Sequence, residues 1–275
     1  IHPCDNPTEP ILVAFFTFVA RDKTTGRAAK INTLSPENAK EKQWFIEASE
    51  RAAQRKLARK AVSKDATPTE MEAKAQREME VDAMVVAARP LAMMPALAPM
   101  DTLIMSDTIL RNTLICQPQH QNTAGKVFGG FLMRRAFEIA FANGYVFSGT
   151  RPGFDSVDQV DFKVGVDVGT LLQFESKVVY TEPDKGMVHV HVSAYITKPE
   201  ERRSVLSNEF VFSFNVNNNM KGKEGDEEEE IEGKEKSSSG ARQALVSGSG
   251  LRHVIPTTVA EAKLQLEVID SLVRV

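Results

Sequence analysis

The chain has 275 residues, 42% of them hydrophobic and 26% charged, and a formal net charge of −3, which is ordinary for a globular protein of one or two domains. This charge balance argues against a general nucleic-acid binder, and no apolar run approaches the roughly 18 residues that span a bilayer. We therefore expect neither nucleic acid nor membrane as a partner. The two cysteines, Cys4 and Cys116, lack metal-ligand spacing, so we expect free thiols, no metal site and no cofactor.

The N-terminal part is predicted to begin with a strand and a helix. Residues 11–20 (ILVAFFTFVA) are apolar and β-favouring, which is typical of a buried strand. A helix over 37–62 is expected to follow, because Ser35 is a good N-cap and Pro36 suits the first helical position.

A second helix is expected to begin at Thr67, which opens the capping sequence TPTE. It should run towards Ala88, because Pro90 cannot donate a helical hydrogen bond. Residues 89–100 are rich in proline and methionine and are expected to form a connector.

From Thr102 the pattern changes to strands around a single helix. A strand is predicted over residues 108–116, and a loop is predicted over residues 117–129. The apolar segment 130–143 predicts a helix that Asn143 and Gly144 would end.

Four more strands are expected after this helix, because apolar residues then recur at every second position. The first covers 160–164, and the others centre on 172–180, 188–196 and 210–216. Residues 182–186 predict a hairpin turn between the second and third of these strands. One apolar helix wrapped by a curved antiparallel sheet is an α+β arrangement.

Two histidines, His189 and His191, fall on the same side of one predicted strand. No third metal ligand accompanies them in the sequence. We expect this side of the strand to face solvent.

The C-terminal region divides into a polar segment and a helix. Residues 217–250 are rich in Asn, Glu, Lys, Ser and Gly, and we expect them to be disordered, with an acidic docking tail as the alternative. A terminal helix is expected over 256–275. The strand and helix at 11–60 resemble the strand and helix at 209–275, which indicates a duplicated domain whose first copy is nearly absent.

The segment 120–130, HQNTAGKVFGG, carries the strongest functional signal. Glycines at a helix start let a ligand approach the backbone closely. The amides of the first helical turn have no acceptor within the helix, so the amide of Gly130 or Phe131 would form an oxyanion hole for a thioester. The alternative is that the glycines only permit close packing.

One acidic residue, Glu138, lies about two turns into this apolar helix, where we expect burial. A buried carboxylate is costly unless it is paired or used in chemistry. It would activate a water molecule, or attack directly, at the thioester carbonyl. The alternative is an ion pair with Arg134 or Arg135, and both can hold together.

These residues resemble a known family. The pattern H-x-N-x-x-G-x-x-x-G-G, followed by an acidic residue on the helix, is similar to that of the hotdog-fold acyl-coenzyme A thioesterases. The segment FGGFLMRRAFEIA, together with FVARD and LSPE upstream, resembles the mitochondrial double-hotdog acyl-coenzyme A thioesterase 9 group. The resemblance implies a hotdog fold, hydrolysis of fatty acyl-CoA to free acid and CoA, and a mitochondrial location.

The resemblance also implies roles for individual residues. Asn122 would orient the thioester or the water, and Glu138, in place of the aspartate of many hotdog thioesterases, would be the catalytic carboxylate. Substrate contacts are expected from residues in the loop and the first turns of the helix: His120, Gly125, Gly129, Phe131 and Arg134. From charge alone, Lys126, Lys163 and Arg134 would meet the phosphates of CoA.

The implied organisation has five parts. They are the last strand of a first hotdog (1–35), a helical linker (36–101), a complete hotdog (102–216), a disordered insert (217–250) and a C-terminal helix (251–275). In this family each site lies between two hotdogs, so a homo-oligomer is expected.

Two other functions stay open. The chain would bind acyl-CoA without hydrolysis if it were a degenerate hotdog. A hotdog hydratase would need an Asp/His pair in the loop, where the chain has Asn122.

Overall fold

The computed structural model describes most of the chain between Val13 and Val273. The described residues are 13–20, 22, 24–25, 27–61, 68–94, 99–123, 125–158, 160, 162–216 and 251–273. They belong to two compact units, Ile1–Glu70 and Met71–Val275. The predicted disordered insert, 217–250, lies outside the described residues.

In the first unit, the helix α1 (Ala39–Ala61) confirms the predicted helix, but its cap differs. Asn38 Oδ1 accepts a hydrogen bond from the Glu41 N–H at 2.8 Å, and the Glu41 carboxylate accepts one from the Glu37 N–H at 2.9 Å. This reciprocal capping box satisfies amides at the helix start, so the helix begins after Asn38 and not at Ser35.

The predicted strand in this unit is wrong for residues 13–20, which form no strand. Their side chains are exposed, with Phe16 74% and Phe18 88% accessible. A strand is stable only when its backbone groups pair with a neighbour, and the described residues of the first unit form no strand that could pair with this segment. Its apolar composition alone could not supply that partner.

The second unit begins with most of α2 (Pro68–Met93), which continues through Pro90 instead of ending before it. Pro90 lies in the last turn, so its missing N–H leaves only one helical carbonyl without a donor, and the Met94 N–H donates to the Pro90 carbonyl at 2.9 Å. Arg77 of α2 forms an ion pair with Asp270 of the C-terminal helix.

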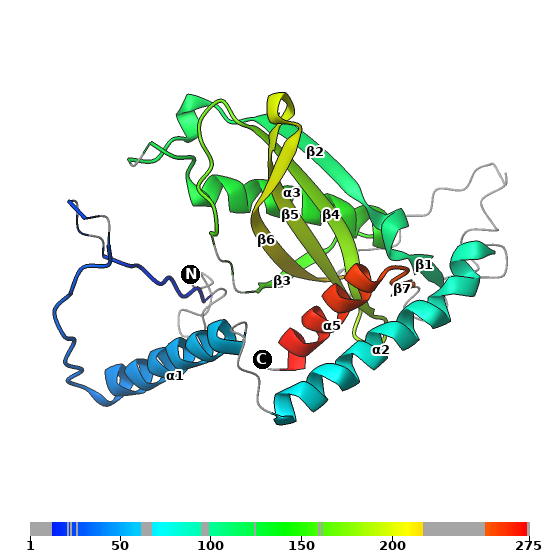
Figure 1. The fold of residues 1–275 in the computed structure, drawn as a ribbon, viewed down its shortest axis with the longest axis horizontal. Helices are drawn as coiled ribbons and strands as arrows, with labels where there is room; N and C mark the ends of the chain where they lie inside the picture. Colours follow the sequence, from blue (N-terminus) through cyan, green and yellow to red (C-terminus); the bar gives the residue numbers. More distant parts are fainter. Residues whose placement is uncertain are drawn as a thin grey trace, which may run out of the picture. The chain divides into compact units, whose positions relative to one another are not determined.

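The second unit is built on a five-stranded antiparallel sheet, in the order β2-β4-β5-β6-β3 (Figure 1). The strands are β2 (Leu110–Ile115), β3 (Gly153–Val157), β4 (Leu171–Glu182), β5 (Met187–Lys198) and β6 (Arg203–Asn215). A small parallel pair joins β1 (Thr102–Ile104) to β7 (His253–Ile255). Short 3-10 helices lie at Met105–Thr108, Pro118–His120 and Pro199–Glu201.

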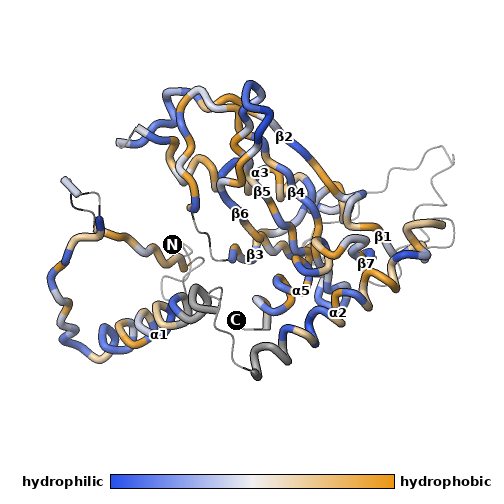
Figure 2. The backbone as a smooth tube through the Cα atoms, viewed as in Figure 1, coloured by the Kyte–Doolittle hydropathy of each residue, from blue (hydrophilic) through white to orange (hydrophobic). Residues whose placement is uncertain are grey.

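The alternating pattern predicted β4, β5 and β6 correctly. The strand predicted over 108–116 is confirmed as β2, and the hairpin turn predicted over 182–186 joins β4 to β5. Apolar residues mark the strand centres, whereas the turn between β5 and β6 is hydrophilic (Figure 2). The strand predicted over 160–164 is wrong, because β3 at Gly153–Val157 occupies the edge of β6 instead. The described residues of 160–164 form a loop held by Ser207, whose hydroxyl donates to the Val164 carbonyl at 2.8 Å.

The helix α3 (Gly129–Ser148) packs against the inner face of this sheet. Its buried residues form one stripe: Leu132, Ala136, Ile139, Ala140, Asn143, Gly144 and Phe147. The helix ends at Gly149, whose φ of 71° is in the left-handed region that favours glycine. The predicted end at Asn143 and Gly144 is therefore wrong.

Asn143 has a packing role that explains why the helix continues past it. Its amide donates to the Thr108 carbonyl and to Ser176 Oγ, both at 2.9 Å, inside the core. The amide thereby ties α3 to the segment before β2 and to β4.

The outer face of the sheet is covered by α5 (Val259–Val273), the predicted terminal helix. Thr258 and Glu261 form its capping box, and the Gln265 amide donates to the Val179 and Val254 carbonyls at 2.7 and 3.0 Å. The prediction of a solvated face is consequently wrong: His189 and His191 are 1% and 4% exposed.

None of the described helices is long and apolar enough to cross a membrane.

We expect Asn143→Ala to destabilise the second unit, because it leaves the buried Thr108 carbonyl without a donor. The free energy of unfolding should fall by about 2–3 kcal/mol, and the thermal midpoint by roughly 5–10 °C. Asn112→Ala, at an exposed position of β2, is the matched control and should change stability by no more than about 0.5 kcal/mol. Equal effects of the two variants would contradict the role given to Asn143.

Candidate active site at the start of helix α3

The loop before α3 is closed by Asn122. The Asn122 N–H donates to the Lys126 carbonyl at 2.7 Å, and Asn122 Oδ1 accepts from the Lys126 N–H at 3.1 Å. The Gly125 N–H donates to the Asn122 carbonyl, and Gly125 has a φ of 78°, which a glycine adopts without strain. Asn122 and Gly125 therefore shape the loop, whatever further role they have.

The loop is also fixed to its surroundings. The Phe128 N–H donates to the His120 carbonyl at 2.7 Å, and the Val127 N–H donates to the Val166 carbonyl at 2.8 Å. Lys126 Nζ lies 2.5 Å from the Asp167 carboxylate. These contacts hold the start of α3 in one position.

Two backbone amides at this start remain available. The amides of Phe131 and Leu132 both donate to the Phe128 carbonyl, at 3.0 and 3.4 Å. No acceptor among the described residues meets the amides of Gly129 and Gly130. Of the two candidates predicted for an oxyanion hole, Gly130 is compatible with the structure, whereas the Phe131 amide is already engaged.

Both glycines lie under aromatic rings. A Cβ atom on Gly129 would lie 2.9 Å from the Phe162 ring, and one on Gly130 would lie 2.4 Å from the Phe128 ring. Both phenylalanines are exposed. Close packing against these two rings therefore favours glycine at both positions, in addition to any contact with a ligand.

The predicted site residues of α3 share one face of the helix. Phe131, Arg134, Arg135 and Glu138 follow at spacings of three and four residues, which places them on one side. The His120 ring stacks on Phe131 with ring centroids 3.7 Å apart, and the Arg135 guanidinium lies 5.4 Å from the Phe131 centroid.

Glu138 is held by two arginines. Arg134 Nε donates to its carboxylate at 3.0 Å and Arg135 Nη1 at 2.7 Å. The predicted ion pair is confirmed, but the expected burial is wrong, because the side chain is 40% exposed and lies outside the buried stripe of α3. Burial raises the pKa of Glu138, and the hydrogen bonds and charges of the arginines outweigh it, so the pKa lies below its usual value and the carboxylate is ionised.

No protein-family profile matches the sequence. Over 274 residues the chain is 40% identical to acyl-coenzyme A thioesterase 4, mitochondrial, of Humulus lupulus, covering 98% of this chain and 46% of that protein. It is 39% identical over 263 residues to acyl-coenzyme A thioesterase 2, chloroplastic, of the same plant, covering 94% and 54%. Acyl-coenzyme A thioesterase 9, mitochondrial, of Homo sapiens is 30% identical over 208 residues, covering 74% and 46%. The chain spans about half the length of these relatives.

A solved structure has a similar fold. A variant of an acyl-CoA hydrolase from Staphylococcus aureus superposes with a TM-score of 0.50 at 21% identity, covering 63% of this chain and 90% of that chain. The chain is a hotdog-fold relative of the acyl-coenzyme A thioesterases. The fold and the resemblance predicted from the sequence are confirmed.

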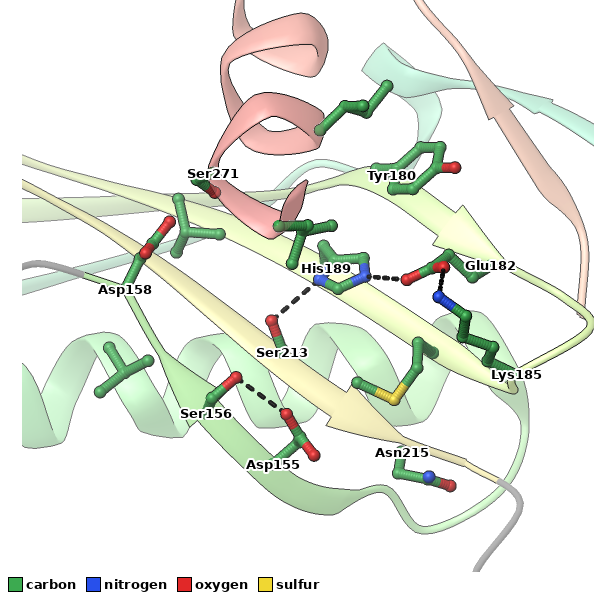
Figure 3. A pocket seen from close by; sticks show the side chains of 15 residues that line it. Asp155, Ser156, Asp158, Tyr180, Glu182, Lys185, His189, Ser213, Asn215 and Ser271 are labelled. Carbon is green, nitrogen blue, oxygen red and sulfur yellow. Dashed lines mark hydrogen bonds and ion pairs between the residues drawn. The ribbon is translucent and has the colours of Figure 1, made fainter. Parts of the chain in front are cut away.

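One cavity of this hotdog lies on the other face of its sheet, between the strands and α5 (Figure 3). Its volume is about 670 Å³, and none of the predicted site residues lines it. His189 lies at its floor, with Nδ1 2.8 Å from Ser213 Oγ and Nε2 3.4 Å from the Glu182 carboxylate. Burial lowers the pKa of His189 more than Glu182 raises it. Apart from the two histidines, no pattern in the sequence indicated this cavity.

Next to this cavity, Glu209 lies 3.5 Å from His191 Nε2 and 2.6 Å from Lys163 Nζ. The hydrogen bond with His191 and the one with Lys163 together outweigh burial and lower the pKa of Glu209 to about 2. Lys163, considered for CoA phosphates, is therefore already paired.

A carboxylate with a depressed pKa stabilises the fold above its unfolded pKa, and this contribution is lost as the pH falls towards the folded value. We expect Glu209→Gln to lower the free energy of unfolding by about 1 kcal/mol at pH 7, a small effect because Glu209 is partly exposed. The difference from the original protein should shrink between pH 4.5 and 2. Urea unfolding at several pH values measures it, with Glu200→Gln in the exposed turn before β6 as control. A difference that stayed constant down to pH 2 would contradict this assignment.

Proposed function

We propose that the chain hydrolyses acyl-CoA thioesters in an assembly of two hotdog units. The observation that carries the proposal is the outward face of α3, which combines unpartnered amides at its start with the ionised carboxylate of Glu138. Sequence similarity to acyl-coenzyme A thioesterases over 98% of the chain supports the substrate class.

A second unit is needed because the two groups are far apart in one helix. Gly130 and Glu138 are eight residues apart, which is about 12 Å along a helix axis. Oxyanion donors and a general base acting on one carbonyl carbon must both lie within a few ångströms of it. A second α3 lying antiparallel on the exposed face of the first would place its Glu138 opposite the first Gly130. In the isolated chain this second unit would be another copy, which makes the protein a homo-oligomer.

In the proposed reaction, Glu138 removes a proton from a water molecule that attacks the thioester carbonyl carbon. The Gly130 amide of the facing unit stabilises the negative charge that develops on the carbonyl oxygen. The carbon–sulfur bond then breaks, the fatty acid forms, and CoA leaves as a thiol after taking up a proton. Asn122 positions the water or the thioester from the loop, next to His120 and Phe131.

Substrate binding would also release Glu138 from its arginines. The phosphates of CoA carry several negative charges and bind guanidinium groups strongly. Arg134 and Arg135 are exposed or half-buried, so they can turn from Glu138 to the phosphates as the substrate enters. The carboxylate then becomes a stronger base at the moment when it is required.

A second candidate function is binding of acyl-CoA without hydrolysis. The observation that favours it is the double ion pair, because a carboxylate held by two guanidiniums is a poor base. This function requires the arginines to stay on Glu138 after acyl-CoA has bound. Acyl-CoA binding without release of CoA would establish it.

Two wider aspects follow from the relatives. They include proteins named mitochondrial and one named chloroplastic, and we propose the mitochondrion for this chain on the resemblance to the thioesterase 9 group. We also propose that residues 1–35 correspond to the end of a first hotdog, a division that rests on the internal repeat.

The test is thiol release from acyl-CoA of several chain lengths, measured on protein of known oligomeric state. We expect Glu138→Gln to lower kcat by about 100-fold or more, because general base catalysis contributes roughly 10²–10⁴. Its thermal midpoint should change little, because exposed ion pairs contribute little to stability. Glu175→Gln, which breaks an exposed ion pair with Arg111 on the sheet, is the matched control and should keep full activity. Hydrolysis left intact in Glu138→Gln would overturn the role of Glu138.

A further inference from the structure

A serine, a histidine and a glutamate form a hydrogen-bonded chain at the floor of the cavity between α5 and the sheet (Figure 3). Ser213 Oγ lies 2.8 Å from His189 Nδ1, and His189 Nε2 lies 3.4 Å from the Glu182 carboxylate. All three side chains line the cavity, and the proposed thioesterase site uses none of them. A serine hydroxyl hydrogen-bonded to an imidazole, which a carboxylate orients in turn, is the arrangement that activates a serine as a nucleophile.

Strand pairing brings these three residues together. His189 of β5 lies directly opposite Ser213 of β6 in the antiparallel ladder. On its other side His189 lies opposite Tyr180 of β4, and the two rings stack with their centroids 5.8 Å apart. Glu182 follows Tyr180 by two residues, so its side chain lies on the same face of β4. The imidazole, 1% exposed, is therefore held in one orientation by the strands on both sides of it.

The charge states of the chain direct the serine proton towards the imidazole. The hydrogen bond from Lys185 keeps the pKa of Glu182 below its usual value, so this carboxylate is ionised and only accepts. Burial lowers the pKa of His189, so the ring is neutral at pH 7 and carries one proton. That proton is on Nε2, which faces Glu182, and Nδ1 accepts the proton of the Ser213 hydroxyl. A neutral imidazole with its free nitrogen on the hydroxyl is the form that acts as a general base.

The same cavity offers a hydrogen-bond donor and apolar walls to a substrate. Asn215 lines the cavity and follows Ser213 on the same face of β6, about 6.6 Å further along the strand. A carbonyl group bridges a gap of this size when its carbon faces the serine and its oxygen faces the amide, which then stabilises the oxyanion. The walls come from four apolar side chains: Met187, Val211, Ile269 and Leu272. A volume of about 670 Å³ is within the range of sites for small organic molecules.

We propose that this cavity is a second hydrolytic site, in which Ser213 is the nucleophile, His189 is the general base and Glu182 positions the imidazole. Its substrate class is an uncharged ester of a short-chain acid, because the walls are apolar and Lys185 already pairs with Glu182. The site lies on the opposite face of the sheet from α3, so it acts independently of the proposed thioesterase site.

In the proposed reaction, Ser213 Oγ attacks the ester carbonyl carbon and its proton passes to His189 Nδ1. The bond between the carbonyl carbon and the alkoxy oxygen then breaks, the alcohol leaves with the proton from His189, and the acyl group stays on Ser213. A water molecule next gives a proton to His189 and attacks the acyl carbon. The carboxylic acid leaves, and the proton returns from His189 to Ser213 Oγ.

The first experiment is labelling with diisopropyl fluorophosphate, an uncharged reagent for activated serines. Ser213 Oγ attacks the phosphorus, its proton passes to His189, and fluoride leaves. We expect an adduct that peptide mass spectrometry places on Ser213, no such adduct in Ser213→Ala, and labelling about 100-fold slower or more in His189→Gln, which lacks the base. Ser156 is the matched control, because it lies opposite Ser213 on β3 and lines the same cavity, but its hydroxyl donates to Asp155 at 2.8 Å. Ser156→Ala should be labelled as fast as the original protein.

The second experiment measures turnover of p-nitrophenyl butyrate, an uncharged short ester with a coloured product. Release of p-nitrophenol should persist in Glu138→Gln, which lacks the base of the proposed thioesterase site. It should fall by about 100-fold or more in Ser213→Ala, because a covalent mechanism loses orders of magnitude in rate without its nucleophile.

The proposal is overturned if the original protein takes up no label, if the label lies on Ser156 or another residue in place of Ser213, or if Ser213→Ala hydrolyses the ester as fast as the original protein. The peptide map of the original protein needs no substitution, so it decides the matter even when a variant does not fold. Ester hydrolysis that depends on Glu138 and not on Ser213 would likewise contradict a second site.

Discussion

The packing of α3 into the inner face of the sheet decides which of its residues can take part in chemistry. One stripe of the helix is buried, and Asn143 fixes its position by hydrogen bonds to the backbone before β2 and to β4. A helix held in this way cannot rotate without leaving buried polar groups unpaired. The opposite face, with Phe131, Arg134 and Glu138, must therefore remain at the surface. Any catalytic site that uses Glu138 has to be completed from outside this helix.

The same packing explains which features the sequence could reveal. Alternating apolar residues predicted β4, β5 and β6, because each of these strands buries side chains in the core. The loop residues from His120 to Gly130 were identified by their order, and the structure brings them together with Phe131 at the start of α3. These features depend on short stretches of chain, in which local patterns and tertiary structure agree.

The errors have a different origin, since each concerns a contact with a distant part of the chain. Glu138 was expected to be buried because its neighbours are apolar, but its angular position on the helix puts it outside the buried stripe. His189 and His191 were expected to face solvent because the sequence of β5 does not indicate that α5 covers this strand. Likewise, the segment 160–164 was predicted to form a strand because of its apolar pattern. The nearby segment Gly153–Val157 pairs with β6 instead and forms β3. Sequence periodicity indicates whether a residue prefers a buried or an exposed position. It does not indicate which other helix or strand covers that residue.

The two faces of the sheet are covered by different helices, α3 on the inner face and α5 on the outer face. On the inner side, the exposed surface of α3 presents arginines and free amides, which suit an anionic acyl-CoA. On the outer side, the cavity under α5 is lined by groups of both charges, among them Lys185 and Glu182, which pair with each other. The sheet lies between them, so the two surfaces can be altered separately by mutation.

The most direct test of a site shared between two units is complementation between two inactive variants. Gly130→Pro removes the proposed donor amide in the first turn of α3, where proline is tolerated. Gly130→Ala keeps the amide and adds the same Cβ atom, so it controls for the contact of that atom with the exposed Phe128 ring, which must turn aside in both variants. When Glu138→Gln and Gly130→Pro proteins are mixed in equal amounts, unfolded and refolded together, half of the dimers are mixed and each contains one intact site. Thioester hydrolysis should then recover to about a quarter of the original activity, as expected for a site formed across a two-fold interface. Recovery to no more than the activity of the separate variants, with Gly130→Ala active and mixed dimers shown to form, would contradict the shared site.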